Sequence, residues 1–190
     1  MFKLSLSSFF VAAALASRTL AECTATFTEG AQYTVSLSAN PQFSWVDNNT
    51  SGFFGVDLKT SPGTEWFLSE TGFGGYVFSL ASDLSSSDCL FASRNDKVPG
   101  SGKIFHSLGC LDGVGELDLD EDFVVTCETC DAAGAGGGSG CSIKSSVTTE
   151  CANTAVNDLS APAGADGTGQ VRTDACSGSD FQKWDVTSVV

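Results

Sequence analysis

Cys127 and Cys130 have the Cys-x-x-Cys spacing that redox enzymes and zinc sites use. A zinc site would need a second cysteine pair or a histidine partner, and His106 is the only histidine of the chain. A redox motif would need a helix start, whereas residues 123–127 before it are typical of a strand. We therefore expect both cysteines to form structural disulfides.

Asp118, Asp120 and Asp122 stand at alternate positions within the acidic segment 112–122, a spacing found among calcium ligands. Phe123, however, occupies the place where an EF-hand loop needs glycine. Alternation of the acids with leucines favours a half-buried strand whose acidic face is solvated. A weak cation site is the alternative interpretation, and we expect no specific metal site.

Residues that could carry catalysis are sparse. His106 follows Phe105 in a predicted strand, no Gly-x-Ser-x-Gly motif occurs, and the carboxylates form no recognisable acid and base pair. The glycine-rich segment 132–140 lacks the Gly-Lys-Ser/Thr of a phosphate-binding loop, so we expect it to be a flexible connection. The sequence therefore predicts neither an enzyme nor a cofactor.

Residues 1–21 have the layout of a secretory signal peptide, with a basic residue, an apolar run at 4–16 and small residues before a predicted cleavage after Ala21. Cleavage after Ala16 is the alternative. The apolar run is shorter than the roughly 20 residues that span a bilayer. We expect a secreted, extracellular protein in which residues 22–190 form a single domain.

The charge of the chain excludes two classes of partner. Nine basic residues stand against 23 acidic ones, a net charge of −14. Loss of Lys3 and Arg18 with the signal peptide lowers this to about −16. Because nucleic acids and anionic membranes both require a basic face, we expect neither as a partner.

All eight cysteines lie outside residues 1–21, and an even number fits disulfides formed in an oxidising compartment. One of Cys127 and Cys130 is expected to hold Cys23 near the N-terminus. The other is expected to cross the glycine-rich segment to Cys141. The sequence does not decide which does which.

Strand signals are short and recur about every ten residues, which is typical of an all-β domain. They lie at 33–37, 43–46, 55–58, 66–68, 76–78, 103–105, 123–125, 142–144 and 184–186. Asn48 and Asn49 begin overlapping glycosylation sequons in a polar turn between two of these strands, and we expect at most one of them to be used.

Trp66, Phe123 and Trp184 stand in three similar short segments, 57 and 61 positions apart, which indicates three related units. Recurring large apolar residues usually fill a core, so we expect all three rings to be buried. Three units of four strands fit the spacing of the strand signals better than an open sandwich does.

The last unit has the most specific pattern. It contains Cys151, then Cys176 about a hairpin later, and Gln182-Lys183-Trp184 shortly after. With this pattern, residues 141–188 resemble one repeat of the ricin B-type β-trefoil lectins. The resemblance implies an all-β, disulfide-stabilised β-trefoil of three four-strand units. A β-sandwich is the alternative fold.

The same resemblance implies two disulfides, because the repeat carries its bridge at this place. It pairs Cys151 with Cys176 in the third unit and Cys89 with Cys110 in the second.

For carbohydrate binding, the resemblance points to Asn153, Gln182 and Trp184. In the family an acidic residue stands at the position of Asn153, an aromatic ring in the following hairpin stacks on the sugar, and Asn stands where this chain has Phe181. No aromatic residue lies between the two cysteines of the third unit. The resemblance therefore implies a degenerate lectin site.

We expect a monomeric, secreted, non-enzymatic binding module for glycans or glycoproteins. A secreted β-trefoil protease inhibitor or another protein-binding effector is the alternative, because a fold alone does not choose between these roles. A purely structural role at a surface is a third possibility, which predicts neither activity.

Overall fold

The structure is a computed structural model that describes residues 22–47, 55–60, 62–82, 89–92, 102–106, 121–131, 136–154 and 169–189. These ranges contain fourteen strands and a short 3-10 helix: β1 (Cys23–Thr24), β2 (Gln32–Leu37), β3 (Asn40–Asp47), β4 (Val56–Lys59), β5 (Trp66–Glu70), β6 (Tyr76–Leu80), β7 (Leu90–Ala92), β8 (Gly102–His106), β9 (Phe123–Cys127), β10 (Thr129–Cys130), β11 (Gly137–Ser145), β12 (Cys151–Thr154), β13 (Val171–Asp174), η2 (Asp180–Gln182) and β14 (Trp184–Val189). Residues 1–21, predicted to be a signal peptide, and both sequon asparagines, Asn48 and Asn49, lie outside the described residues.

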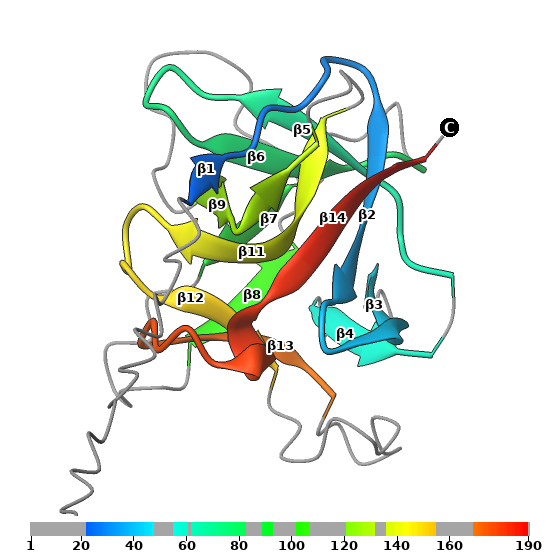
Figure 1. Ribbon diagram of the computed structural model, residues 1–190, viewed down its shortest axis with the longest axis vertical. Coiled ribbons are helices and arrows are strands. Elements are labelled where there is room, and N and C mark those ends of the chain that lie inside the picture. The colour runs from blue at the N-terminus through cyan, green and yellow to red at the C-terminus, as the bar shows by residue number, and fades with distance from the viewer. Residues whose placement is uncertain are drawn as a thin grey trace, which may run out of the picture.

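Six strands close into an antiparallel barrel (Figure 1). Going around it, β2 pairs with β5, β5 with β6, β6 with β9, β9 with β11, β11 with β14, and β14 again with β2. A closed ring satisfies the backbone of every member and leaves no sheet edge within it. This closure excludes the alternative β-sandwich.

Six further strands form three hairpins, one from each unit. They are β3 with β4, β7 with β8, and β12 with β13. The hairpins meet one another, since β8 pairs with β13 and β4 contacts both. The units are therefore β2–β5, β6–β9 and β11–β14, and the β-trefoil of three four-strand units that the sequence predicts is confirmed.

The three repeated aromatics occupy equivalent places in the barrel. Trp66, Phe123 and Trp184 are the first residues of β5, β9 and β14, and each is at most 1% exposed. Each stands opposite an inward residue of the first strand of its own unit: Trp66 opposite Tyr33, Phe123 opposite Tyr76, and Trp184 opposite Cys141. The register therefore repeats along with the residue type.

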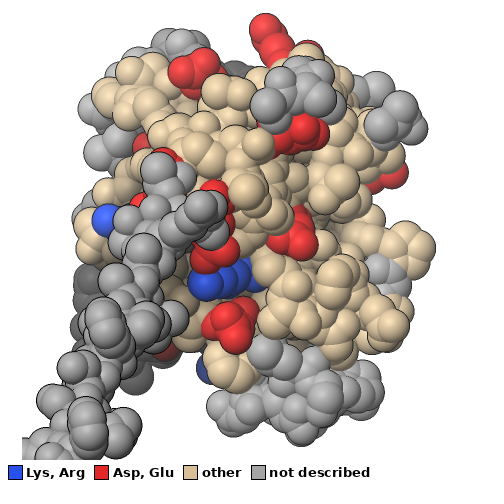
Figure 2. Space-filling model, in the orientation of Figure 1, with Lys and Arg blue, Asp and Glu red and all other residues tan. Residues whose placement is uncertain are grey.

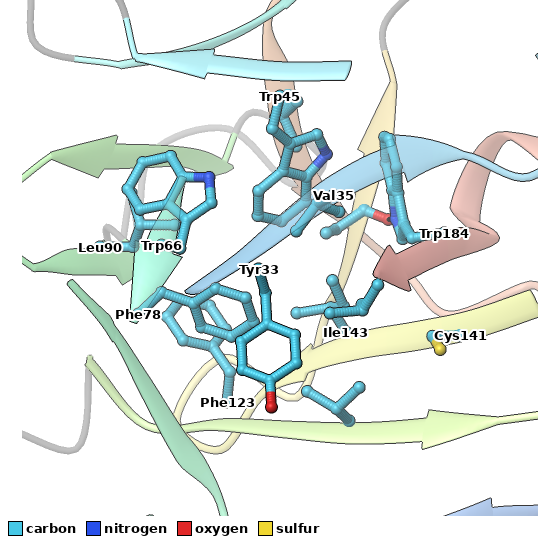
Figure 3. Packing of buried hydrophobic residues seen from close by; sticks show 14 of the residues in the cluster. Tyr33, Val35, Trp45, Trp66, Phe78, Leu90, Phe123, Cys141, Ile143 and Trp184 are labelled. Carbon is cyan, nitrogen blue, oxygen red and sulfur yellow. Dashed lines mark hydrogen bonds between the residues drawn. The ribbon is translucent and has the colours of Figure 1, made fainter. Parts of the chain in front are cut away.

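These aromatics belong to one hydrophobic core (Figure 3). Trp45 lies between Trp66 and Trp184 in this view, and its ring meets Trp184 edge to face with centroids 5.2 Å apart. Phe78 packs in the same way against Phe123, at 5.7 Å. Edge-to-face pairs of this kind add to the stabilisation from apolar burial. The prediction that the three repeated rings are buried in the core is thus confirmed.

Two interleaved disulfides fasten the start of the chain to its middle. Cys130 bonds Cys23, and Cys127 bonds Cys141. Cys130 thus holds the N-terminal strand while Cys127 reaches across the glycine-rich segment, which is the assignment that the sequence left open.

A third disulfide joins Cys151 to Cys176, the pair implied by the lectin resemblance. Cys89 is also disulfide-bonded. Cys110 lies outside the described residues, so its pairing with Cys89 stays a prediction.

The flexible connection predicted at 132–140 is wrong for its second half, because residues 137–140 belong to β11. Glycine is needed there for close backbone approach. Gly137 has φ 110°, and a Cβ on it would lie 2.4 Å from the carbonyl oxygen of Val186. A Cβ on Gly138 would lie 2.5 Å from that of Thr129. The glycines let β10, β11 and β14 approach one another closely. Residues 132–135 are not described.

The solvated acidic face predicted for residues 116–122 is wrong at Asp122, which is only 4% exposed. Its carboxylate accepts hydrogen bonds from the hydroxyl groups of Thr71 and Ser146. A buried carboxylate persists only with such partners. Asp118 and Asp120 lie outside the described residues.

Candidate functional site

The outward face of the β12–β13 hairpin in the third unit brings together three polar side chains. Val171 and Thr173 point into the core, so the alternation of a strand turns Arg172 and Asp174 outward. Asn153 on β12 stands directly opposite Arg172 in the antiparallel register. Directly opposed residues share a face and lie within side-chain reach of each other.

Hydrogen bonds fix one end of this cluster. The Nδ2 atom of Asn153 donates to Oδ2 of Asp174 at 3.3 Å. The other carboxylate oxygen, Oδ1, accepts from the backbone N–H of Ala175 at 2.7 Å. Asp174 therefore orients the Asn153 amide and holds its nitrogen side.

Two polar atoms of the cluster have no partner. The Oδ1 atom of Asn153 and the Nε atom of Arg172 are both buried and make no hydrogen bond. A buried polar group left in this state costs about 1 to 3 kcal/mol, and native structures usually give a reason for it. The two residues are opposed in the register and only half-buried as a whole, so a rotation of either side chain would bring its unpaired atom to a hydroxyl group of a ligand.

Gln182 lies behind this face and is 3% exposed. Its Oε1 atom accepts from the backbone N–H and the hydroxyl of Ser177, at 2.7 and 3.1 Å. Its Nε2 atom donates to the carbonyl of Ala175 at 2.8 Å. Gln182 thus clamps the segment that follows Asp174, and it leaves only a small exposed edge for contact with a ligand.

Trp184 lies deeper still, with no exposed surface. Its Nε1 atom donates to the carbonyl of Ala152 at 3.1 Å, which fixes the strand that carries Asn153. A fully buried ring cannot stack on a sugar. Of the three residues predicted from the resemblance, only Asn153 therefore stands at the surface, and the other two support it from within.

A cleft of about 330 Å³ adjoins the disulfide of this unit. Cys151 and Cys176 line it together with residues from β9, β11 and the segment before β14, among them Glu128, Lys144 and Lys183. The Nζ atom of Lys183 lies 2.7 Å from a carboxylate oxygen of Glu128. This hydrogen bond raises the pKa of the Lys183 ammonium. Figure 2 shows basic side chains flanked by acidic ones on the face where β11, β12 and β14 lie.

Arg172 and Asp174 were missed by the sequence-based prediction. The alternation of Val171, Arg172, Thr173 and Asp174 is a strand signal that could have turned both polar residues outward. No sequence signal places Arg172 opposite Asn153, because that register depends on how the hairpin closes.

Elsewhere in the described part of the chain, no helix is long and apolar enough to cross a membrane. The same residues contain no group of three or more His, Cys, Asp or Glu side chains arranged to hold a metal ion.

No protein-family profile and no curated protein matches the sequence. Solved structures do match the fold. The designed threefold-symmetric protein ThreeFoil superposes with a TM-score of 0.58 at 15% identity, covering 83% of this chain and 99% of that one. The BEL β-trefoil gives a TM-score of 0.55 at 17% identity, over 85% and 95% of the two chains.

A ricin B-like lectin from Macrolepiota procera, solved in complex with lactose, is similar as well. It gives a TM-score of 0.54 at 11% identity, over 85% of this chain and 97% of the lectin. These structural similarities establish the β-trefoil fold, which ricin B-like lectins also have. At identities this low they do not identify the ligand, which has to be argued from the site.

Proposed function

We propose that the protein is a secreted, non-enzymatic binding module that recognises carbohydrate, as a free glycan or on a glycoprotein. The observation that carries this proposal is the Oδ1 atom of Asn153, which is buried, oriented by Asp174 and without a partner. It belongs to the residue that stands where the ricin B-type repeat hydrogen-bonds its sugar.

The chemistry of the cluster suits a sugar. A carbohydrate presents neighbouring hydroxyl groups, each of which donates and accepts a hydrogen bond. The empty acceptor on Asn153 and the empty donor on Arg172 match two such hydroxyls. An unpaired polar group costs free energy in the unbound protein. A ligand that pairs both groups removes this cost, so its binding free energy is more favourable than the new contacts alone would give.

Support for the site comes from the buried residues behind it. Gln182 holds the segment after β13, and Trp184 holds β12 through Ala152. Binding groups fixed by buried neighbours lose little conformational entropy when a ligand arrives. Gln182 and Trp184 thus contribute to binding by positioning and not by contact.

Secretion is supported by the layout of residues 1–21 and by three disulfides among the described residues. Disulfides persist in oxidising compartments. The mature chain of the proposal comprises residues 22–190 and acts as a monomer.

A glycan array probed with the mature protein tests the proposal. We expect retention on a defined set of glycans and its loss, by tenfold or more, in Asn153→Ala. Gln42→Ala is the matched control, because it removes an exposed amide from a hairpin of the first unit and should leave retention unchanged. Thermal unfolding of each variant checks that the fold is intact. Failure to bind any glycan, together with tight binding to a protease, would favour the inhibitor alternative.

A further inference from the structure

Among the basic side chains that the structure describes, Lys59 and Lys183 pair with acids, whereas Lys144 and Arg172 do not. The chain has 23 acidic residues to nine basic ones, so a basic side chain has many possible partners. Lys59 pairs with Asp57 at 3.3 Å, and Lys183 pairs with Glu128 at 2.7 Å. Lys144 is exposed to water, but the Arg172 side chain is half-buried, and its Nε atom is buried without a hydrogen-bond partner.

This isolation is costly. A guanidinium group is always charged at physiological pH, and its donors are usually satisfied by carboxylates, carbonyls or water. A buried donor without a partner costs about 1 to 3 kcal/mol, and more when it carries charge. In so acidic a chain, an arginine without a carboxylate partner is unexpected unless something else binds it.

The acid on the same strand face forms no ion pair with Arg172. Asp174 lies on the same face of β13, but its two oxygens already accept from Ala175 and Asn153. The Arg172 side chain therefore has no carboxylate partner among the described residues.

We propose that Arg172 binds an anionic group, a carboxylate or a sulfate, on an acidic saccharide. This rests on the proposed function and specifies its ligand class: Asn153 accepts from a sugar hydroxyl while Arg172 binds the acid next to it. A guanidinium presents a planar fork of donors that matches both anions. Recognition is short in range, because the overall negative charge of the protein repels such ligands at a distance.

The test uses an array on which each neutral glycan is accompanied by its sulfated and its sialylated form. The wild-type protein is expected to retain acidic members at least tenfold more strongly than their neutral parents. Arg172→Gln is expected to abolish that preference, and Arg172→Lys to keep part of it. Lys59→Gln is the control, because it removes an equal charge from an exposed lysine on β4, outside the candidate site.

Each outcome separates the two proposals. Retention of acidic members that Arg172→Gln removes and Lys59→Gln does not supports the role of Arg172, and the sulfated and sialylated forms then identify the anion. Equal retention of neutral and acidic members, unchanged in Arg172→Gln, overturns that role and leaves glycan binding standing. Absence of retention on any glycan overturns both.

Discussion

Thr71 donates a hydrogen bond from its hydroxyl to the Oδ1 atom of Asp122, 2.7 Å away and 51 residues later in the chain. Asp122 also accepts from the hydroxyl of Ser146. One buried carboxylate thus joins the turn between the first two units to the turn after β11. Hydrogen bonds of this kind, made between different units, fix the positions of the units relative to one another.

We expect Asp122→Asn to lower the free energy of unfolding by about 1 to 3 kcal/mol, because the amide leaves one of the two hydroxyl donors without an acceptor. Urea unfolding followed by tryptophan fluorescence measures it. Asp180→Asn is the matched control on an exposed acid of η2 and should change stability by less than about 0.5 kcal/mol. Equal effects of the two substitutions would contradict the bridging role of Asp122.

Trp66 and Trp184 occupy equivalent positions but differ in their hydrogen bonding. The Nε1 atom of Trp184 donates to Ala152, whereas that of Trp66 is buried without a partner. Trp184→Phe should therefore destabilise the fold more than Trp66→Phe, by about 1 kcal/mol, because only the former loses a hydrogen bond. Both lose similar ring volume, so each is the other's control in urea unfolding. A larger loss in Trp66→Phe would contradict the argument.

Gly137→Ala should cost about 1 to 3 kcal/mol, since it forces a side chain into a left-handed backbone and against the carbonyl of Val186. Gly72→Ala is the control, because a Cβ there meets nothing within 4 Å. Thermal unfolding distinguishes the two. If the segment were a flexible connection, both substitutions would be equally tolerated.

Stability should fall above about pH 10. Burial, with a further contribution from Glu70, raises the pKa of the Tyr76 hydroxyl above its ordinary value of 10.0. The hydrogen bond to Glu128 raises that of Lys183 above 10.5. A group with a raised folded-state pKa holds its proton more tightly when folded. Its contribution is complete below the ordinary value and is lost as the pH rises through the folded pKa.

Urea unfolding at a series of alkaline pH values measures this loss. Tyr76→Phe cannot ionise, so the free energy of unfolding of this variant should depend less steeply on pH than that of the wild type. The variant starts from a lower stability at neutral pH, because it also loses the hydrogen bond to the carbonyl of Ala25. An unchanged slope would show that Tyr76 does not contribute to the alkaline transition.

The sequence predicted the barrel well because barrel strands combine alternation with large side chains. Tyr33, Val35 and Leu37 in β2 are an example, and every strand signal noted in the sequence overlaps an observed strand, with only residue 55 falling outside one. The strands that the sequence did not predict are two to four residues long: β1, β7, β10, β12 and β13. In β12 and β13 the inward positions are held by small or polar residues such as Ala152 and Thr173, which give little periodic signal.

The candidate site was less predictable for a different reason. Asn153 was found because it stands at a fixed distance from Cys151. Arg172 joins it only through the register of a hairpin whose two strands are separated by residues 155–170. The buried Asp122 illustrates the same limit, since its partners are 51 and 24 residues away. A pattern within one segment cannot report what a distant segment supplies.

The crossed arrangement of the bonds Cys23–Cys130 and Cys127–Cys141 has a consequence for proteolysis. A single cut anywhere from residue 23 to residue 141 falls inside at least one of these covalent loops, and a cut between 151 and 176 falls inside the third. Cleaved protein should therefore still migrate as one species without reductant. Among these bonds none spans residues 142–150, so a cut there leaves the first two units and the remainder of the third held together only by packing.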